Sequence, residues 1–217
     1  NAPSTIPEKQ AAAAVGQGLL MRAWSDAFSD HKLAVAQLLL TQSDFHDRRR
    51  YINARNTLNK IMEYGAVPII NENDTVAIEE IRVGDNDTLS ALVTAAINAD
   101  LLILLSDVQG LYGPDGKVVP DIEEINQEVF KLASGAGKFG TGGMHTKLEA
   151  ARIAGSCGVT TVISHGREPN VVLRIASGEH LGTWFQPKNS ALCSRKRWIA
   201  FGRRPKGVIV VNQGARY

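Results

Sequence analysis

The 217-residue sequence lacks the features that mark secreted, membrane-bound or nucleic-acid-binding proteins. Its two cysteines, Cys157 and Cys193, are too few for a disulfide framework and are expected as small core residues of a protein kept in a reducing cytosol. No apolar run is long enough to cross a bilayer. The net charge of +2 gives no broad electrostatic case for nucleic acid. We therefore expect a cytoplasmic globular domain without a membrane or nucleic-acid partner.

The amino-terminal residues Asn-Ala-Pro-Ser-Thr show neither an initiator Met nor a signal-peptide pattern. The expectation is a chain that begins partway into a longer protein. The 44% hydrophobic composition suits one sizeable globular domain, with the beginning of another.

Short apolar runs alternate with amphipathic segments along the chain. The runs that predict strands are 33–40, 66–70, 101–105 and 159–163. The run 33–40 is apolar enough to be buried on both faces, whereas Pro68 places its run at an edge or bulge. The segments that predict helices are the one opened by the capping signature of Thr5 and Glu8, then 48–64, 89–98 and 144–156. This order predicts an α/β fold with a mostly parallel sheet and helices on both faces, in which ligands sit beyond the carboxyl ends of the strands.

Two polar clusters flank the loop after the second predicted strand, NEND at 71–74 and VGDND at 83–87. Asp87 is placed to cap the helix expected from Leu89. Either cluster alone would be explained by turn and cap residues. Together they also suit a cation or the ammonium group of a substrate, although nothing fixes a metal coordination. After the third strand, Ser106 and Asp107 precede Gly110, which permits a sharp turn. On its own this is as well explained by an ordinary strand end.

A glycine-rich stretch leads into TGGMHTK, residues 141–147. Its G-x-G-x-x-G match at 135–140 does not follow a strand directly, because residues 121–133 are helical or irregular, and no Walker A motif occurs anywhere. Backbone N–H groups at a helix start bind phosphate, and glycine lets the backbone come close. Two threonine hydroxyls and the Lys147 charge would add to such a site. The alternative is a mobile loop with a solvated lysine.

The polar clusters at 71–74 and 83–87, the Ser106–Asp107 pair and TGGMHTK at 141–147 occur in this order along the chain. Together they resemble the motifs of the glutamate 5-kinases of the amino acid kinase family. The resemblance also covers residues 9–17 and 195–199, almost the whole chain. It implies a three-layer αβα sandwich, with residues 1–190 as the kinase domain and 191–217 as a linker and candidate start of a PUA-like domain. It implies ATP-dependent phosphorylation of the L-glutamate side-chain carboxylate to glutamyl 5-phosphate, the first step of proline synthesis.

The resemblance also implies roles for individual residues. Asp74 and Asn86 would hold glutamate through its α-amino group, with Asn71 and Asp85 as weaker candidates. Lys147 would stabilise the transferring phosphoryl group, Asp87 would orient catalytic lysines, and Mg²⁺ would bridge the phosphates without a protein metal site. The residues implied to hold ATP are Ser106, Asp107, Thr141, Gly142, Gly143, Met144, His145, Thr146 and Lys147, with the His145 side chain expected to be a bystander.

The sequence departs from the family pattern at its start and in one loop. The family begins with a Lys-x-Gly strand, followed by a Ser-Gly-Ala segment, and neither stands before Asn1. The kinase domain is therefore expected to be incomplete at its amino terminus. Residues 111–119 are shorter than the family pattern, so the loop on the adenine side is expected to differ.

Phosphoryl transfer asks mainly for positioning and charge neutralisation. A carboxylate acceptor is ionised near neutral pH and needs no general base, which agrees with the absence of a histidine cluster. Other acceptors stay open, namely acetylglutamate, aspartate, carbamate or a nucleoside monophosphate. A non-catalytic amino-acid sensor or RNA-binding module, motivated by the basic segment 195–206, also stays open. A homodimer or homotetramer and feedback inhibition by proline are expected from the resemblance alone.

Overall fold

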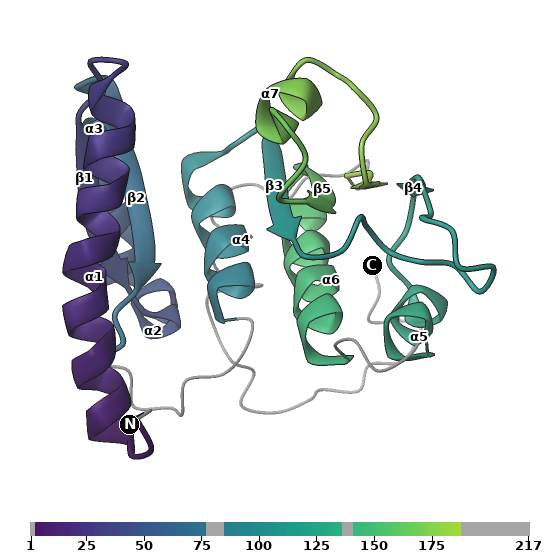
Figure 1. Ribbon diagram of the computed structural model, residues 1–217, viewed down its shortest axis with the longest axis horizontal. Coiled ribbons are helices and arrows are strands. Elements are labelled where there is room, and N and C mark those ends of the chain that lie inside the picture. The colour runs from purple at the N-terminus through teal and green to yellow at the C-terminus, as the bar shows by residue number, and fades with distance from the viewer. Residues whose placement is uncertain (1–2, 77–84, 136–140, 188–217) are drawn as a thin grey trace, which may run out of the picture.

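Two β-sheets organise the structure, a computed structural model that describes residues 3–76, 85–135 and 141–187 (Figure 1). In the first sheet, β1 (Val35–Leu40) pairs in parallel with β2 (Val67–Glu72). The strands of the second sheet lie in the order β3 (Leu101–Ser106), β5 (Thr160–His165), β6 (Thr183–Phe185) and β4 (Asp121–Ile122). The β3–β5 and β4–β6 pairs are parallel, and β5–β6 is antiparallel. The expectation of an α/β protein with mostly parallel pairing is confirmed, but the strands form two sheets in the described residues.

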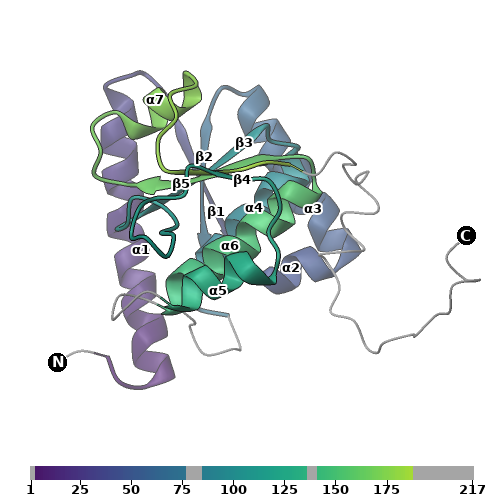
Figure 2. The ribbon, with the colours of Figure 1, turned by 90° about the vertical axis from the view of Figure 1, so that its right-hand side faces the viewer.

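Helices precede and follow these strands along most of the chain. Their bounds are α1 (Ile6–Ser29), α2 (Gln42–His46), α3 (Arg48–Glu63), α4 (Asp85–Ile97), α5 (Gln127–Gly135), α6 (Thr141–Ser156) and α7 (Val171–Ala176). Figure 2 shows the second sheet edge-on, with α7 on one face and α5 and α6 on the other. Within the described residues, none of these helices combines the length and apolar composition that a bilayer crossing requires.

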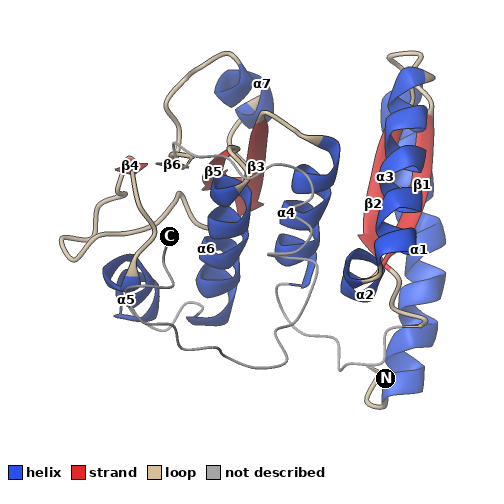
Figure 3. Ribbon diagram, turned by 180° about the vertical axis from the view of Figure 1, so that it is seen from behind, coloured by secondary structure: helices blue, strands red, loops and turns tan. Residues whose placement is uncertain are grey.

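Helix α4 lies between the two sheets and packs into a core on each side (Figure 3). Leu89, Leu92, Val93 and Ala96 belong to the core of the first sheet, together with Leu58 of α3. Ala91 and Ala95, on another side of α4, belong to the core formed by the second sheet and α6. The 3.6-residue helical period separates these two sets of side chains. Because α4 is fixed from both sides, its first turn has a defined position between the two halves.

The helix ends follow the sequence signals in two places. Thr5 caps α1 in a capping box with Glu8, as predicted. Gly65, with φ of 73°, follows Tyr64, the C-cap residue of α3, so that this helix ends within one residue of the predicted bound. Cys157 is buried, as expected for a small core residue, whereas Cys193 lies outside the described residues.

Other predictions were wrong in detail. Residues 33–40 were expected to be buried on both faces, yet Leu38 is the buried member of β1 and Leu33 is 42% exposed, because β1 is covered less completely than a central strand. Helix α4 begins at Asp85, so Asp87 lies in the first turn and is not the capping residue. Residues 141–143, expected as a loop, open α6.

Several short elements were not predicted, and some expectations fall outside the structure. The segments β4, β6, α2 and α7 are too short to give a periodic signal. The expected linker and second-domain start at 191–217 lie outside the described residues.

Candidate functional site

The first turn of α4 holds two neighbouring candidate residues, Asn86 and Asp87, which are bonded to different parts of the fold. The Asp87 carboxylate faces α6. Its Oδ2 lies 3.1 Å from Lys147 Nζ and accepts a 2.7 Å hydrogen bond from the Thr146 hydroxyl. Its Oδ1 lies 3.3 Å from the same Nζ. The structure thus brings together Asp87, Thr146 and Lys147.

The Asp87–Lys147 pair is largely shielded from water. The two side chains are 16% and 15% exposed. A lysine ammonium has three N–H donors, so contacts with Asp87 leave donor capacity for an anionic ligand. Asp87 can therefore hold the positive charge of Lys147 at a fixed point near the amino end of α6.

Thr146 has a different geometry from the one expected of a phosphate donor. Its single hydroxyl proton can go to Asp87 Oδ2 at 2.7 Å or to the Gly143 carbonyl at 2.9 Å. Both acceptors belong to the protein. In this arrangement the Thr146 side chain helps to orient Asp87.

Asn86 faces the first sheet. Its Nδ2 donates to Asn71 Oδ1 at 3.2 Å, and Asn71 Nδ2 donates to Gln17 Oε1 at 2.9 Å. Asn71 lies near the carboxyl end of β2, and Asp74 follows in the turn just beyond that strand. Asn71, a weaker sequence candidate, is thus bonded to Asn86. Gln17 was not a candidate, although it ends the 9–17 segment that carried part of the family resemblance.

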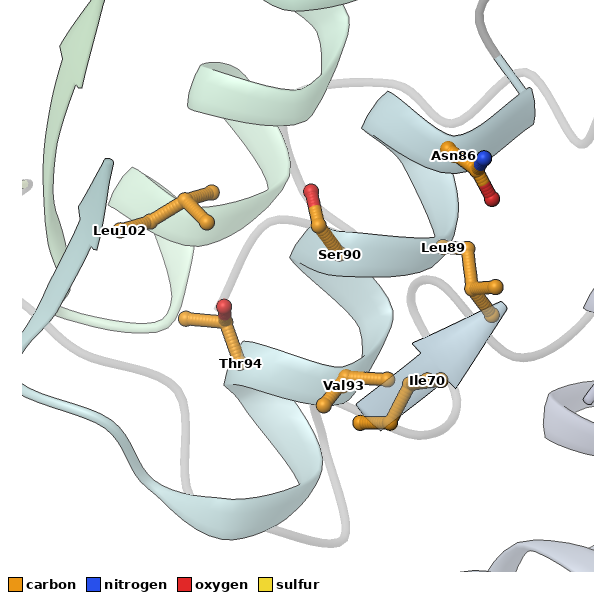
Figure 4. Close-up of a pocket in the computed structure, with 7 residues that line it drawn as sticks. All are labelled: Ile70, Asn86, Leu89, Ser90, Val93, Thr94 and Leu102. Atoms are coloured by element: carbon orange, nitrogen blue, oxygen red, sulfur yellow. The ribbon is translucent and has the colours of Figure 1, made fainter. Parts of the chain in front are cut away.

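A cavity of about 380 Å³ separates β2, α4 and β3 next to Asn86 (Figure 4). Its other lining residues are Ile70, Leu89, Ser90, Val93, Thr94 and Leu102. In Figure 4, Asn86 lies at the amino end of α4, whereas Leu89 and Val93 lie close to Ile70. The lining is mainly apolar, and its polar members are Asn86, Ser90 and Thr94.

The amino end of α6 supplies backbone donors. An α-helix leaves the N–H groups of its first turn without helical partners, and here these include the N–H groups of residues 141–143. Of the side chains, Met144 packs against the core of the second sheet. His145 is exposed, and its ring centroid lies 5.0 Å from that of Phe130 in α5. The side chains of Asp85 and Thr141 lie outside the described part of the structure, and Gly142 belongs to the backbone of the first turn of α6.

Ser106 and Asp107 lie at the carboxyl end of β3. The Ser106 hydroxyl donates to Asp107 Oδ1 at 3.1 Å, and the Ser106 carbonyl accepts from the Gly166 N–H at 2.8 Å. The hydrogen bonds among the described residues do not connect this pair with Lys147. It forms a separate polar group at a neighbouring strand end.

A metal held wholly by protein side chains finds no support in the described residues. No group of three or more His, Cys, Asp or Glu side chains gathers within 3–76, 85–135 and 141–187. The carboxylate with the best-defined position, Asp87, is engaged by Lys147 and Thr146.

The shielded Lys147, in the second turn of α6, can neutralise an anionic group, and the amides of Asn86 on α4 and Asn71 on β2 can bind a small polar molecule. The model of the amino acid kinase family matches residues 2–164, and the chain belongs to this family.

Individual relatives are called glutamate 5-kinases. The one from Caldanaerobacter subterraneus is 49% identical over 98% of this chain, and the one from Syntrophotalea carbinolica is 52% identical over 99%. The relative from Picosynechococcus is 48% identical over 98%. The chain spans 59% of the length of each of these relatives. Among solved structures, N-acetylglutamate synthase from Neisseria gonorrhoeae aligns with 63% of this chain and 31% of its own at 18% identity, with a TM-score of 0.49 that carries no argument about function.

Proposed function

We propose that this protein transfers the terminal phosphoryl group of ATP to the side-chain carboxylate of L-glutamate, giving glutamyl 5-phosphate in the first step of proline synthesis. Identity of about one half to relatives called glutamate 5-kinases supports this substrate. One structural observation carries the proposal. Consecutive residues of α4 are bonded to the two predicted half-sites, Asn86 to the one for glutamate and Asp87 to the one for phosphate.

In this proposal, Asp74 and Asn86 bind the ammonium group of glutamate, with Asn71 behind Asn86. Ser106, Asp107 and the start of α6 bind ATP. A glutamate carboxylate oxygen attacks the terminal phosphorus, the bond from that phosphorus to the ADP oxygen breaks, and ADP leaves. The acceptor is already ionised, so no proton has to be removed. Lys147, held by Asp87, neutralises negative charge on the phosphoryl oxygens while the phosphoryl group is transferred.

Mg²⁺ fits this site through the nucleotide. When bound, it would reduce the negative charge of the ATP phosphates. Because the described residues offer no cluster of three metal-binding side chains, the protein's own contribution is Lys147 and the backbone donors of α6.

The finer organisation expected from the family belongs to the same proposal. We infer that the two sheets are parts of one three-layer αβα sandwich within the kinase domain of residues 1–190. Residues 191–217 would lead into a PUA-like domain. A cytoplasmic location, a dimer or tetramer, and inhibition by proline follow from the same family membership and stay predictions.

Trapping of the acyl phosphate tests the proposed function directly. The full-length protein is incubated with ATP, Mg²⁺ and hydroxylamine, which converts an acyl phosphate into a hydroxamate. L-Glutamate, N-acetylglutamate, aspartate, carbamate and a nucleoside monophosphate serve as separate acceptors, with ADP release as the readout for those that form no acyl phosphate. We expect glutamyl hydroxamate and glutamate-dependent ADP release. Turnover with another acceptor and none with glutamate would refute the assignment.

A further inference from the structure

Three side-chain amides form a continuous hydrogen-bonded chain between distant segments of the sequence. Gln17 belongs to α1, Asn71 to β2 and Asn86 to the first turn of α4. The chain consists of the 2.9 Å bond from Asn71 to Gln17 and the 3.2 Å bond from Asn86 to Asn71. It therefore links α1 to the residue expected to meet the substrate's ammonium group.

The chain has a direction. Asn71 uses its NH₂ group on Gln17 and presents its carbonyl oxygen to the NH₂ group of Asn86. Asn86, an exposed residue, then has its carbonyl oxygen left for a ligand. At the other end, Gln17 Nε2 is buried and has no hydrogen-bond partner among the described residues. The useful atom of Gln17 is thus its acceptor oxygen.

We propose that Gln17 is a positioning residue that orients this amide chain so that Asn86 offers an acceptor, not a donor, to the ammonium group of the amino-acid substrate. The inference rests on the proposed function, because it deepens the role of the glutamate half-site. The reverse orientation would present an NH₂ group to a ligand group that carries only donors, and the two could not form a hydrogen bond. Gln17 therefore contributes to substrate selection without touching the substrate.

Two substitutions of Gln17 test the direction of the chain in the full-length protein. Gln17→Met keeps the length of the side chain but removes the acceptor, whereas Gln17→Glu keeps an acceptor and removes the unpartnered donor. Binding of L-glutamate is measured by calorimetry, which does not depend on turnover. We expect Gln17→Met to raise the glutamate Kd by roughly 3- to 10-fold, the effect of losing one hydrogen bond, and Gln17→Glu to stay within about 2-fold of wild type.

Glutarate, which is glutamate without the ammonium group, separates positioning from general damage. Its Kd is expected to be the same for wild type and Gln17→Met, as is the Kd of ATP. Arg22→Met, an exposed change on the same helix, is the matched control and should alter none of these values. Thermal unfolding of each variant reports whether the fold is kept.

Three results would overturn the inference: an unchanged glutamate Kd in Gln17→Met, an equal loss in Gln17→Glu, or a matching loss of glutarate binding. If glutarate binds too weakly to measure, the comparison of the Met and Glu variants decides. A protein that binds glutamate but does not phosphorylate it would contradict the proposed function and leave this inference standing.

Discussion

Lys147 and Asp87 form a shielded ion pair, in which each side chain compensates the charge of the other. Both side chains are more than four-fifths shielded from solvent. Removing one member of such a pair leaves the remaining charge without its partner in a site of low dielectric. Variants at this pair therefore need a measurement of stability beside every measurement of rate.

Lys147→Ala is expected to lower kcat by roughly 10²- to 10³-fold, the loss typical of removing one group that stabilises transition-state charge. The glutamate Kd should stay within about 2-fold, because Asn86 and Asn71 keep their hydrogen bonds. Steady-state kinetics and calorimetry check the two values. Lys60→Ala, which removes an exposed lysine on α3, is the control and should leave both unchanged. Equal loss of binding and rate in Lys147→Ala would contradict the role given to this lysine.

Asp74→Ala is expected to weaken glutamate binding by roughly 10- to 100-fold, because a hydrogen bond between two charged groups is lost. The effect should be on the glutamate Kd, with the ATP Kd preserved. Asp100→Ala removes an exposed carboxylate between α4 and β3 and serves as the control. An unchanged glutamate affinity in Asp74→Ala would remove Asp74 from the site.

Gly110 was expected to permit a sharp turn, but the structure gives it another role. Its φ is not positive, and a Cβ placed there would lie 2.6 Å from Thr183 Oγ1 and 2.8 Å from Val118 Cγ1. Thr183 cannot easily move, because its hydroxyl accepts from the Leu111 N–H and donates to the Val119 carbonyl. Gly110 is therefore needed for close packing between the loop after β3 and β6.

Gly110→Ala is expected to destabilise the protein by about 1–3 kcal/mol through overpacking. Gly18→Ala is the matched substitution, since Gly18 lies inside α1 with no atom within 4 Å of the added Cβ. It should stabilise by about 0.5–1 kcal/mol. Denaturant unfolding measures both. Equal effects of the two substitutions would show that the contact with Thr183 does not matter.

The kinds of residue in the site could be predicted from the sequence, but their mutual contacts could not. The clusters around Asp74, Asp87 and Lys147 stand out because charged, amide and glycine residues gather after predicted strands. The bond between Asn71 and Gln17 joins positions 54 residues apart, and nothing local encodes it. For the same reason, the pairing of Thr146 with Asp87 was not expected.

At the scale of elements, long periodic segments were predicted well and short ones were missed. The helix at 48–64 is found as α3 over Arg48–Glu63 because its apolar period and its glycine stop agree. The start of α4 was placed too late, because Asp87 is a plausible capping residue by type, whereas in the fold the helix already begins at Asp85. The strand β6 is three residues long, and its antiparallel pairing with β5 depends on contacts far along the chain.

The amino end of α1 gives a prediction about pH. Hydrogen bonds to Glu8, first from the Thr5 N–H and then from Ser4, lower the pKa of this carboxyl group from 4.5 to about 2. Because the folded pKa is depressed, this stabilisation of α1 is present above the ordinary value and is lost as the pH falls from 4.5 towards about 2. NMR titration of the Glu8 carboxyl carbon should give a midpoint near 2.

Glu8→Gln is the control for this titration. Its first helical turn should show no further pH-dependent fraying between pH 4.5 and about 2, since the titrating group is gone. A wild-type midpoint at the ordinary glutamate value would mean that the capping box does not form in solution.

At the scale of the whole molecule, α4 unites two halves that the sequence presents separately. The predicted mostly parallel pairing is correct, but no local pattern reveals that the described strands fall into two sheets with α4 between them (Figure 3). The strand after α1 was expected to be buried on both faces, yet most of its side chains are only partly buried. Burial depends on which strands lie alongside, and apolar composition alone does not specify the neighbours.

The most direct test of the account is a structure of the full-length protein with L-glutamate and a non-hydrolysable ATP analogue bound together. The account predicts that the glutamate ammonium group lies at Asp74 and Asn86, while its side-chain carboxylate faces the terminal phosphate beside Lys147. Glutamate and nucleotide bound in separate clefts, with the first turn of α4 touching only one of them, would contradict it.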